Sequence, residues 1–573
     1  MPRDRTLVYG LTFTVALCSI VYELIYSEML TVVFGGRAVR YAITIGLFLF
    51  FLGLGAFAFD DLGDARENFF RVEGYLAVAG PAGLLYLVYL NAVPVGDVEI
   101  PRNVSLVLSH LPVVVVGFLS GLEIPLLTAL LEEVGEDEPL APMARRGVDG
   151  ARRVLRSLLA GPFVVDDGTS GDPDAFSAVL GMDYLGSLVG TVAYALWLFP
   201  ELGLFPSVFV LGMLNAVAAL AFAARFGDRR TVLGDSVSVR VGGGSAVLTA
   251  AVLVLAAVYG GVVLDGERVE SAMTETYLEA SIENEYPGQQ MDVEVTEHFT
   301  TRYQEVTRYR RTWTGDRRDW AGPGQTETCL RLDGQLQLCE NWVRPYHRGL
   351  VDVPASLFED FGDKKVLLVG GGDFVAVDHL REYGVTVDQV DIDREFMAYA
   401  RNSSFLSRYH QGAYRYENLT TIVDDAFSYL QETDERYDLI LLDVPGIRND
   451  ELLSLYSVEF YELLADHLSD DGLVVTWAYS RTQFAEHHHV YMNTVEEAGF
   501  ERYASYRTYG DLNGDGDDEP VERYYVLATG ESAERSLPSD ADRELTWRPI
   551  PRYRGVEPNS IFHPNYDIIV DFR

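Results

Sequence analysis

Residues 366–373 have the sequence Val-Leu-Leu-Val-Gly-Gly-Gly-Asp, in which a short apolar run ends in three glycines and an acid. An apolar run of this length is typical of a buried strand in a parallel sheet. Glycines placed directly after such a strand let the backbone approach a ligand closely where the next helix begins. The stretch therefore predicts an α/β domain with a binding site for a nucleoside-type ligand.

The residues that follow continue this alternation of strands and helices. We expect a helix over 373–383 and strands at 387–390, 421–423, 439–442 and 472–477, in a parallel, doubly wound sheet. The carboxyl ends of such strands meet at one edge, where Asp391 can accept hydrogen bonds from a ribose and Asp424 or Asp425 from an adenine amino group. The predicted cofactor-binding residues are Gly370, Gly372, Asp373, Asp391, Asp393, Asp424, Asp425 and Asp443.

The first 264 residues have a different character, because they contain seven apolar segments long enough to span a bilayer. Residues 132–177, between the fourth and fifth segments, are rich in Glu, Asp and Arg and are predicted to form a surface loop. We expect a membrane bundle of seven transmembrane helices. The segments are 7–34, 42–59, 73–95, 104–131, 178–199, 204–225 and 245–264.

The arginines of the connecting loops predict an orientation for this bundle. If the N-terminus is cytoplasmic, most of them fall on the cytoplasmic side, and the short loops opposite carry only Arg37, Arg40 and Arg102. Seven crossings then place residues 265–573 outside, so we expect a multi-pass protein of the cytoplasmic membrane with an extracellular C-terminal domain. Cys329 and Cys339 flank Asp333-Gly334 in a predicted hairpin and could form a disulfide outside, or could be two half-buried strand cysteines.

Polar residues inside the apolar segments suggest a second site. Ionisable groups in hydrocarbon are costly and usually face the interior of a bundle. Glu23, Glu123, Asp183 and Tyr184 are therefore candidate catalytic residues for lipid or proton chemistry, although helix packing alone would also explain such groups. Near the outer end of the first helix pair, Arg37, Arg40 and Tyr41 could bind a lipid phosphate or anchor the chain at the interface.

Composition excludes one class of partner. The chain has 573 residues, with 45 basic and 85 acidic side chains and a net charge of −40. Nucleic-acid surfaces need clustered Lys and Arg, so no nucleic-acid partner is expected. A membrane lipid is the expected partner, and the acidity is typical of proteins that work in high salt, which predicts a halophilic source.

A loop near the C-terminus has the ligand spacing of a calcium-binding EF-hand. Oxygen-bearing side chains occupy positions 1, 3, 5, 7, 9 and 12 of residues 511–522, with a glycine at position 6. The flanking residues favour strands rather than helices, so we expect a calcium loop on a β-hairpin, or else a plain acidic turn. The predicted ligands are Asp511, Asn513, Asp515, Asp517, Glu519 and Glu522.

Taken together, these motifs resemble the spermidine synthase (polyamine aminopropyltransferase) family, and more closely its membrane-bound branch in a haloarchaeal-type form. The resemblance is carried by residues 332–337, 370–373, 391–393, 424–426 and 455–461. It implies a small β domain over 265–355, a methyltransferase-like Rossmann domain over 356–530 and a tail over 531–573. It also implies a decarboxylated S-adenosylmethionine donor, a polyamine acceptor and the substrate-binding residues Tyr303, Gln304, Gln337, Tyr346 and His347.

The departures from that pattern favour a different function. Trp342-Val343, Arg348 and Gly446 stand where the family has acids, and Phe374 replaces a small residue. The polyamine site is therefore expected to be degenerate. Our main expectation is a membrane transferase or assembly factor at the outer face, acting in archaeal lipoprotein lipidation. A lipoprotein thiol would attack an isoprenoid lipid with Glu23 or Glu123 as base, and a paralogous membrane protein is a conceivable partner. The alternatives are an aminopropyltransferase or methyltransferase with an S-adenosyl donor, and a non-enzymatic scaffold.

Overall fold

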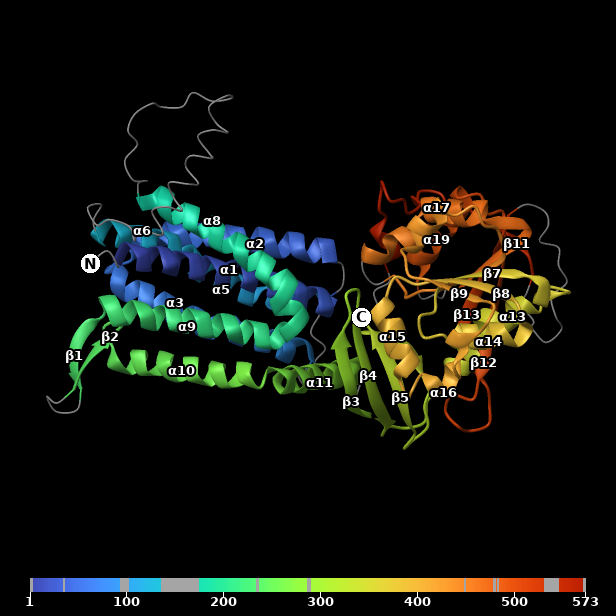
Figure 1. Ribbon diagram of the computed structural model, residues 1–573, viewed down its shortest axis with the longest axis horizontal. Coiled ribbons are helices and arrows are strands. Elements are labelled where there is room, and N and C mark those ends of the chain that lie inside the picture. Colours follow the sequence, from blue (N-terminus) through green and yellow to red (C-terminus); the bar gives the residue numbers. More distant parts are fainter. Residues whose placement is uncertain are drawn as a thin grey trace, which may run out of the picture. The chain divides into compact units, whose positions relative to one another are not determined.

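The computed structural model describes ten segments of the chain, which divides into two compact units. Unit 1 ends at Ala280 and unit 2 begins at Ser281. Each is described by itself below, and both are drawn in Figure 1. The described residues are 4–34, 37–92, 102–134, 175–232, 237–285, 290–447, 450–477, 481, 484–529 and 546–569.

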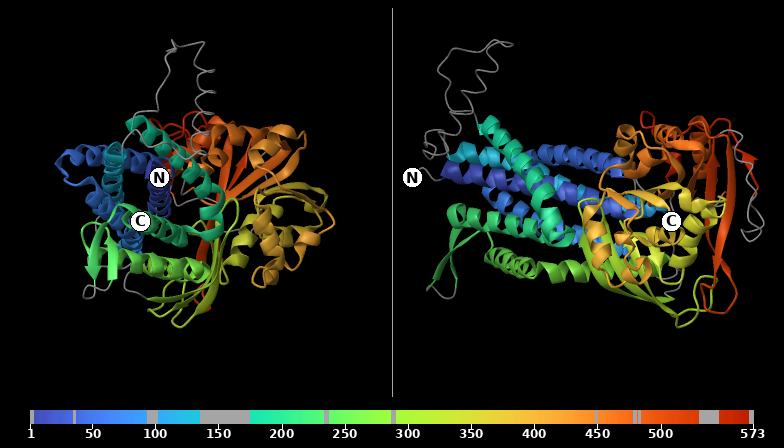
Figure 2. Two further views of the ribbon diagram at one scale, coloured as in Figure 1. Left: turned by 60° about the vertical axis from the view of Figure 1, so that its left-hand side comes forward. Right: turned by 45° about the vertical axis from the view of Figure 1, so that its right-hand side comes forward.

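Unit 1 is built of long helices that run side by side, with one short β-hairpin (Figures 1 and 2). Its described elements are α1 (Asp4–Phe34), α2 (Arg37–Ala58), η1 (Phe59–Asp61), α3 (Ala65–Ala92), α4 (Arg102–Ser109), α5 (Leu111–Gly121), α6 (Glu123–Val134), α8 (Ala175–Ala193), η2 (Tyr194–Leu202), α9 (Leu204–Phe226), β1 (Asp228–Val232), β2 (Val237–Val241), α10 (Ala246–Leu264) and α11 (Gly266–Glu285).

Seven stretches of helix among the described residues are long and apolar enough to cross a membrane, judged by length and composition. They overlap the seven predicted segments one by one. Most of the predicted 132–177 loop, residues 135–174, lies outside the described residues. The stretches are Asp4–Phe34, Val39–Asp61, Ala65–Leu90, Val104–Val134, Ala175–Leu202, Leu204–Phe226 and Ala246–Leu264.

Two glycines let α2 and α5 touch backbone to backbone. A Cβ on Gly55 of α2 would overlap the Phe118 carbonyl of α5, and a Cβ on Gly121 would overlap the Leu52 carbonyl of α2. Close backbone approach of this kind is how apolar helices pack where hydrocarbon offers no hydrophobic driving force. The contact explains why small residues interrupt otherwise bulky apolar segments here.

Unit 2 contains a four-stranded antiparallel sheet before the α/β part. Its strands β3 (Met291–Thr300), β4 (Glu305–Trp313), β5 (Thr326–Leu332) and β6 (Gln335–Cys339) pair in sequence order. The predicted small β domain is therefore present as a sheet. Residues 266–285, assigned to it from sequence, instead form helix α11.

The hairpin β5–β6 brings two cysteines opposite each other. Asp333 and Gly334 both have positive φ, at 48° and 71°, and form a two-residue turn. A register shift next to Leu330 then pairs Cys329 with Cys339, and the two are joined in a disulfide. Of the two alternatives drawn from the sequence, the disulfide is the one that the structure has.

Removing this disulfide should destabilise unit 2. It closes a short loop, with a sequence separation of 10 residues, so its loss should cost about 2–3 kcal/mol through the unfolded chain. The measurement is denaturant unfolding of wild type and of a Cys329→Ala/Cys339→Ala variant, with and without reductant. Reductant should lower the midpoint for wild type only, and equal midpoints throughout would contradict the prediction.

The second sheet of unit 2 has eight strands in the order β14-β12-β13-β11-β10-β7-β8-β9. The five strands from β11 to β9 are parallel, as predicted. At the other edge the strands predicted to flank the calcium loop as a hairpin join the same sheet, and β12, β13 and β14 are antiparallel. The strands are β7 (Lys365–Gly370), β8 (Thr386–Val390), β9 (Leu419–Ile422), β10 (Tyr437–Asp443), β11 (Leu468–Trp477), β12 (Arg502–Gly510), β13 (Glu519–Ala528) and β14 (Arg548–Pro549).

The antiparallel edge has a simple cause. Only residues 511–518 connect β12 to β13, which is too short for the crossover that parallel neighbours need. The hairpin flanking the predicted calcium loop is thus present.

The described helices of unit 2 are α12 (Val343–His347), η3 (Arg348–Asp352), α13 (Val353–Ala355), η4 (Phe361–Asp363), α14 (Val375–Tyr383), α15 (Arg394–Asn402), α16 (Ser407–His410), η5 (Ala413–Arg415), α17 (Ala426–Glu432), η6 (Asp450–Tyr456), α18 (Val458–Asp466), α19 (Ala485–Glu497) and η8 (Tyr566–Ile568).

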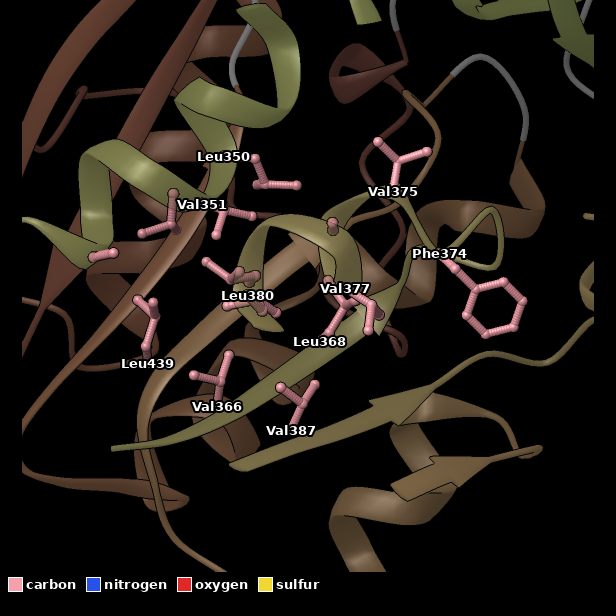
Figure 3. Close-up of a cluster of buried hydrophobic side chains, with 14 of the residues drawn as sticks. Leu350, Val351, Val366, Leu368, Phe374, Val375, Val377, Leu380, Val387 and Leu439 are labelled. Carbon is pink, nitrogen blue, oxygen red and sulfur yellow. The ribbon is translucent and has the colours of Figure 1, made fainter. Parts of the chain in front are cut away.

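Apolar residues cover both faces of this sheet. Along β7, Val366 and Leu368 pack on one face with α14, and Leu367 and Val369 pack on the other with α18 and α19. Figure 3 shows the first of these clusters, and Figure 2 shows helices on the two sides of the sheet. Strands buried on both faces read as continuous apolar runs, which explains the sequence of residues 366–369. This packing fixes the strand ends that carry the site.

Candidate functional site

A cavity of about 440 Å³ lies in unit 2 where the carboxyl ends of β7, β8, β9 and β10 meet the small sheet. All thirteen cofactor- and substrate-binding residues predicted for this half of the chain line it. Their placement together is observed, while their roles stay predictions. They are Tyr303, Gln304, Gln337, Tyr346, His347, Gly370, Gly372, Asp373, Asp391, Asp393, Asp424, Asp425 and Asp443.

The glycine turn after β7 forms the floor of the cavity. Gly370 and Gly371 have φ of 83° and 66°, in the left-handed region that favours glycine. A Cβ on Gly370 would overlap the Asp443 carbonyl at the end of β10, and the Gly371 amide donates to that carbonyl at 3.2 Å. The turn is therefore held against β10 with its backbone open to the cavity.

The two acids after β8, Asp391 and Asp393, differ in the hydrogen bonds that their carboxylates accept from the protein. Asp393 Oδ1 accepts from the amides of Glu395 and Phe396 and begins α15. Its Oδ2 accepts from the Thr301 hydroxyl at 2.6 Å and the Gln304 amide at 2.8 Å. Asp393 and Gln304 thus bind each other, and Thr301 is a partner that sequence reasoning missed.

Asp391 is the better candidate for binding a ligand. It accepts hydrogen bonds from the amides of Asp393 and Gly372, so its carboxylate is aimed at the glycine turn. Burial raises the pKa of Asp391 to about 7, an effect that these amide hydrogen bonds partly offset. A half-buried acid at the end of the second strand is well placed to accept hydrogen bonds from ribose hydroxyls.

Asp424 and Asp425 follow β9. Asp425 Oδ1 accepts from the Ser428 amide at 2.9 Å and so caps α17. Asp424 is exposed and accepts from the Asp425 amide. Of the two, Asp424 is the one whose carboxylate is left for an adenine amino group.

Four polar residues converge at the inner end of the cavity. The Tyr346 hydroxyl donates to Asp443 Oδ1 at 3.0 Å. His347 Nδ1 lies 2.7 Å from the Val343 carbonyl, which fixes the proton on that nitrogen. Its Nε2 has no hydrogen-bond partner among the described residues and faces Asp373 Oδ2 and Asp443 Oδ2, each 4.0 Å away. Three acceptor atoms therefore point at one small volume.

Electrostatics at this point favour proton transfer. Burial, and then the charge of Asp373, raise the pKa of Asp443 to about 8, while the hydrogen bond from Tyr346 acts to lower it. Burial also lowers the pKa of His347, so its imidazole is neutral. A carboxyl with a pKa this close to neutrality is suited to act as a general base.

Residues 343–509 match the family model described as the spermine/spermidine synthase domain. The C-terminal unit is spermidine synthase-like.

Relatives match over both units of the chain. "Polyamine aminopropyltransferase 1" of Streptomyces coelicolor is 29% identical over 499 residues, which are 87% of this chain and 80% of that protein. "Polyamine aminopropyltransferase 2" of Ralstonia nicotianae is 28% identical over 507 residues, covering 87% and 84%. A spermidine synthase structure from Thermotoga maritima covers 46% of this chain and 82% of its own, at 19% identity and a TM-score of 0.33.

The structure locates the residues at which this spermidine synthase-like unit departs from the family pattern. Arg348 is exposed and Val343 is buried in the core, and neither lines the cavity. Phe374 has φ of 64° and is buried against His410 and Tyr414, so it leaves the cavity open (Figure 3). The expected cation at 348 is therefore absent from the site.

One further departure changes the assignment of the base. We expected the acid that acts on an amine at position 446, where this chain has glycine. Gly446 does not line the cavity, whereas Asp443, three residues earlier, lies in it with Tyr346. The spermidine synthase-like unit thus retains an acid in reach of a reacting group.

In the predicted calcium loop, side-chain oxygens accept hydrogen bonds from backbone amides of the same loop. Asp511 accepts from the amides of Asp515 and Gly516, and Asn513 accepts from the Asp515 amide. Glu519, the first residue of β13, accepts from the Asn513 side chain, whereas Glu522 lies further along the strand, where burial raises its pKa to about 7. It interacts electrostatically with Tyr346 instead. Calcium binding by the remaining loop residues stays a prediction.

One of the predicted acids of unit 1, Glu123, belongs to a chain of buried polar side chains. Glu123 is buried and interacts electrostatically with Glu73 of α3, a residue that sequence reasoning missed. The Asn215 amide donates to Glu73 at 2.9 Å, and the Tyr22 hydroxyl donates to Asn215 at 3.0 Å. Side chains from four helices therefore meet in one polar chain, with Glu123 at its end.

The other predicted residues of unit 1 differ in exposure. Glu23 is buried, Asp183 is half-buried and interacts electrostatically with Glu123, and Tyr184 is 66% exposed. Tyr41 donates to Glu28 at 2.6 Å, and Arg40 lies over the Phe34 ring. Arg37 begins α2, but its side chain lies outside the described residues. The catalytic and lipid-binding roles of these residues stay predictions.

Proposed function

We propose that unit 2 is a transferase that takes an aminopropyl group from a sulfonium nucleoside, decarboxylated S-adenosylmethionine, and moves it to an amine. The observation that carries the proposal is the Tyr346–Asp443 hydrogen bond in a cavity formed by strand ends. The names of the relatives, polyamine aminopropyltransferases, agree with this activity.

The cavity suits a positively charged nucleoside. Six aspartates lie on the loops after β7, β8, β9 and β10, and a phosphate group would be repelled there. Gly370–Gly372 would support the nucleoside, Asp391 its ribose and Asp424 its adenine. The sulfonium carbon would then lie near the inner end of the cavity, beside Asp373 and Asp443.

The same charges favour the decarboxylated donor over S-adenosylmethionine itself. S-adenosylmethionine carries a carboxylate on the chain that extends from sulfur. In this cavity that group would approach the carboxylate of Asp373, which repels it in a poorly solvated space. An ammonium group alone would instead be attracted. Aminopropyl transfer is therefore favoured over methyl transfer.

The reaction needs one base. The acceptor nitrogen attacks the carbon bonded to sulfur, a C–N bond forms, and the C–S bond breaks with its electron pair going to sulfur. The proton lost by nitrogen passes to the Asp443 carboxylate. Tyr346 donates to Oδ1 of that carboxylate and so holds the other oxygen toward the acceptor.

Donor binding is the direct test. The full chain in detergent is titrated calorimetrically with decarboxylated S-adenosylmethionine and with S-adenosylmethionine. Tighter binding of the former is expected, with Asp391→Asn weakening it about tenfold or more through loss of a charged acceptor. Asp434→Asn, an exposed acid outside the cavity, is the matched control. If neither nucleoside binds, the proposal fails.

The pH profile follows from the raised pKa of the base. Asp443 acts only when deprotonated, and its pKa is raised to about 8. We expect kcat/KM to rise about tenfold per pH unit below that value and to level off above it. Tyr346→Phe removes a hydrogen bond that favours the charged form, so the profile should move to higher pH. A flat profile between pH 6 and 8, or no movement in the variant, would argue against this base.

A second function is favoured by one observation, the Cys329–Cys339 disulfide. Such bonds persist in oxidising compartments, which agrees with the outward orientation predicted from the loop arginines. Unit 2 would then act outside, as in lipoprotein lipidation, with Glu123 as a base for a thiol. S-adenosyl donors are cytosolic, so the two functions require opposite sides of the membrane.

Labelling decides between these two functions. Intact cells carrying a cysteine at an exposed position of unit 2, such as Asp434→Cys, are treated with a membrane-impermeant maleimide. Labelling without lysis would support the outward function and contradict use of a cytosolic donor. Labelling only after lysis would support the transferase that we propose first.

A further inference from the structure

The walls of the unit 2 cavity differ in charge. Its aspartates lie on the loops after the parallel strands, apart from Asp333 in the β5–β6 turn. The facing wall comes from the small sheet, residues 302–304 and η6. Its described lining residues, besides Arg302 and Asp333, are uncharged: Tyr303, Gln304, Leu330, Leu332, Gln335, Gln337, Leu338, Leu452, Ser454 and Leu455.

Each of the two charged residues of that wall contacts another part of the protein. Asp333 Oδ1 accepts from the Glu305 amide at 2.8 Å, within the turn that joins β5 to β6. Arg302 is exposed, and its guanidinium lies over the Tyr303 ring. Among the described residues the facing wall thus offers one carboxylate, Asp333, together with the Arg302 guanidinium, and otherwise leucine and amide side chains.

Most of the carboxylates on the other wall already have hydrogen-bond partners within the protein or an assigned role. Both oxygens of Asp393 are used within the protein, and Asp425 caps α17. Asp391 and Asp424 are assigned to the nucleoside. Only Asp373 and Asp443 remain at the reactive centre, where they would face the attacking nitrogen and the donor chain. A remote ammonium of a polyamine would be desolvated against Leu332 or Leu455 without a partner, which is strongly unfavourable.

We infer that the acceptor is a primary amine on an apolar body, with a single positive charge, rather than a polyamine. This inference rests on the proposed transferase activity and specifies its substrate class. Only the attacking nitrogen would be bound by carboxylates, and the rest of the acceptor would pack on leucines of β5, β6 and η6. Burial of methylene groups there would replace the ion pairs that hold a polyamine.

A pair of amines of equal size tests the inference. In 1-aminohexane a methyl group stands where 1,5-diaminopentane has its second ammonium. The full chain, loaded with decarboxylated S-adenosylmethionine, is assayed for transfer to each. We expect kcat/KM to be about tenfold or more higher for 1-aminohexane. A preference for the diamine, or transfer to neither amine by a chain that binds the donor, would overturn the inference.

A matched pair of variants makes the test independent of folding. Leu455→Asp places a carboxylate on the neutral wall, and Leu455→Asn places a group of the same size without the charge. The ratio of kcat/KM for diamine over monoamine should rise at least tenfold in Leu455→Asp and stay near the wild-type ratio in Leu455→Asn. Equal ratios in the two variants would contradict the inference. Absence of donor binding in wild type would instead refute the proposed function itself.

Discussion

Asp443→Asn is expected to lower kcat/KM for aminopropyl transfer by about 10²–10⁴-fold, the range that a positioned general base contributes. The amide keeps an oxygen that can accept from Tyr346, so the local hydrogen bond can survive. It cannot take up the proton that the acceptor nitrogen loses. Steady-state kinetics with a radiolabelled donor would measure the loss, and titration calorimetry would show donor affinity within about threefold of wild type.

Two comparisons separate a base from a structural role. Tyr346→Phe should lower the rate by less than Asp443→Asn, because it leaves the carboxylate in place. Asp434→Asn, outside the cavity, should leave the rate unchanged. An Asp443→Asn variant with full activity at any pH would show that another group removes the proton.

Gly370→Ala is expected to destabilise unit 2 by about 2–5 kcal/mol. Its φ of 83° is unfavourable for alanine, which costs roughly 1–2 kcal/mol. The added Cβ would also overlap the Asp443 carbonyl, and overpacking of this kind costs roughly 1–3 kcal/mol more. Denaturant unfolding followed by tryptophan fluorescence would report mainly on unit 2, because five of the six tryptophans, all except Trp197, lie there.

Gly384→Ala separates the cost of the unfavourable φ from the cost of the Cβ overlap. Gly384 has φ of 77°, and a Cβ there would meet nothing within 4 Å. Only the backbone cost remains, so its loss of stability should be about 1–2 kcal/mol. Equal destabilisation by the two variants would show that contact with the end of β10 does not constrain the glycine turn.

The parallel part of the sheet could be predicted from sequence because its strands are buried on both faces. Residues 366–369 then appear as an apolar run followed by glycines and Asp373, and β7 lies where that run does; β8 was found from Val387 and Val390 and the acid at 391 that follows them, although Asp388 and Gln389 lie between the two valines. Strand direction at the sheet edge is a different matter. It depends on the length of the β12–β13 connection, and the strand-like flanks of residues 511–522 predicted that hairpin but not its place at the edge of this sheet.

The candidate site was predicted residue by residue but not in its details. Substitution at 348 and 374 suggested an altered cavity, yet the direction of a side chain is decided by packing, and both point elsewhere. Glu73 was missed because it stands at the border of an apolar segment. Its partner Asn215 is 142 residues away and could be found only in three dimensions.

The hydrogen bonds around Asp393 have an evolutionary consequence. This one carboxylate begins α15 and also ties the β3–β4 turn, through Thr301 and Gln304, to the α/β part of unit 2. Its loss would release two elements at once, so selection for folding alone would preserve it. A descendant that had abandoned the nucleoside would still keep Asp393, whereas Asp424, which holds no helix, would be free to drift. The contrast between these two positions across related chains would therefore record which of them still bind the donor.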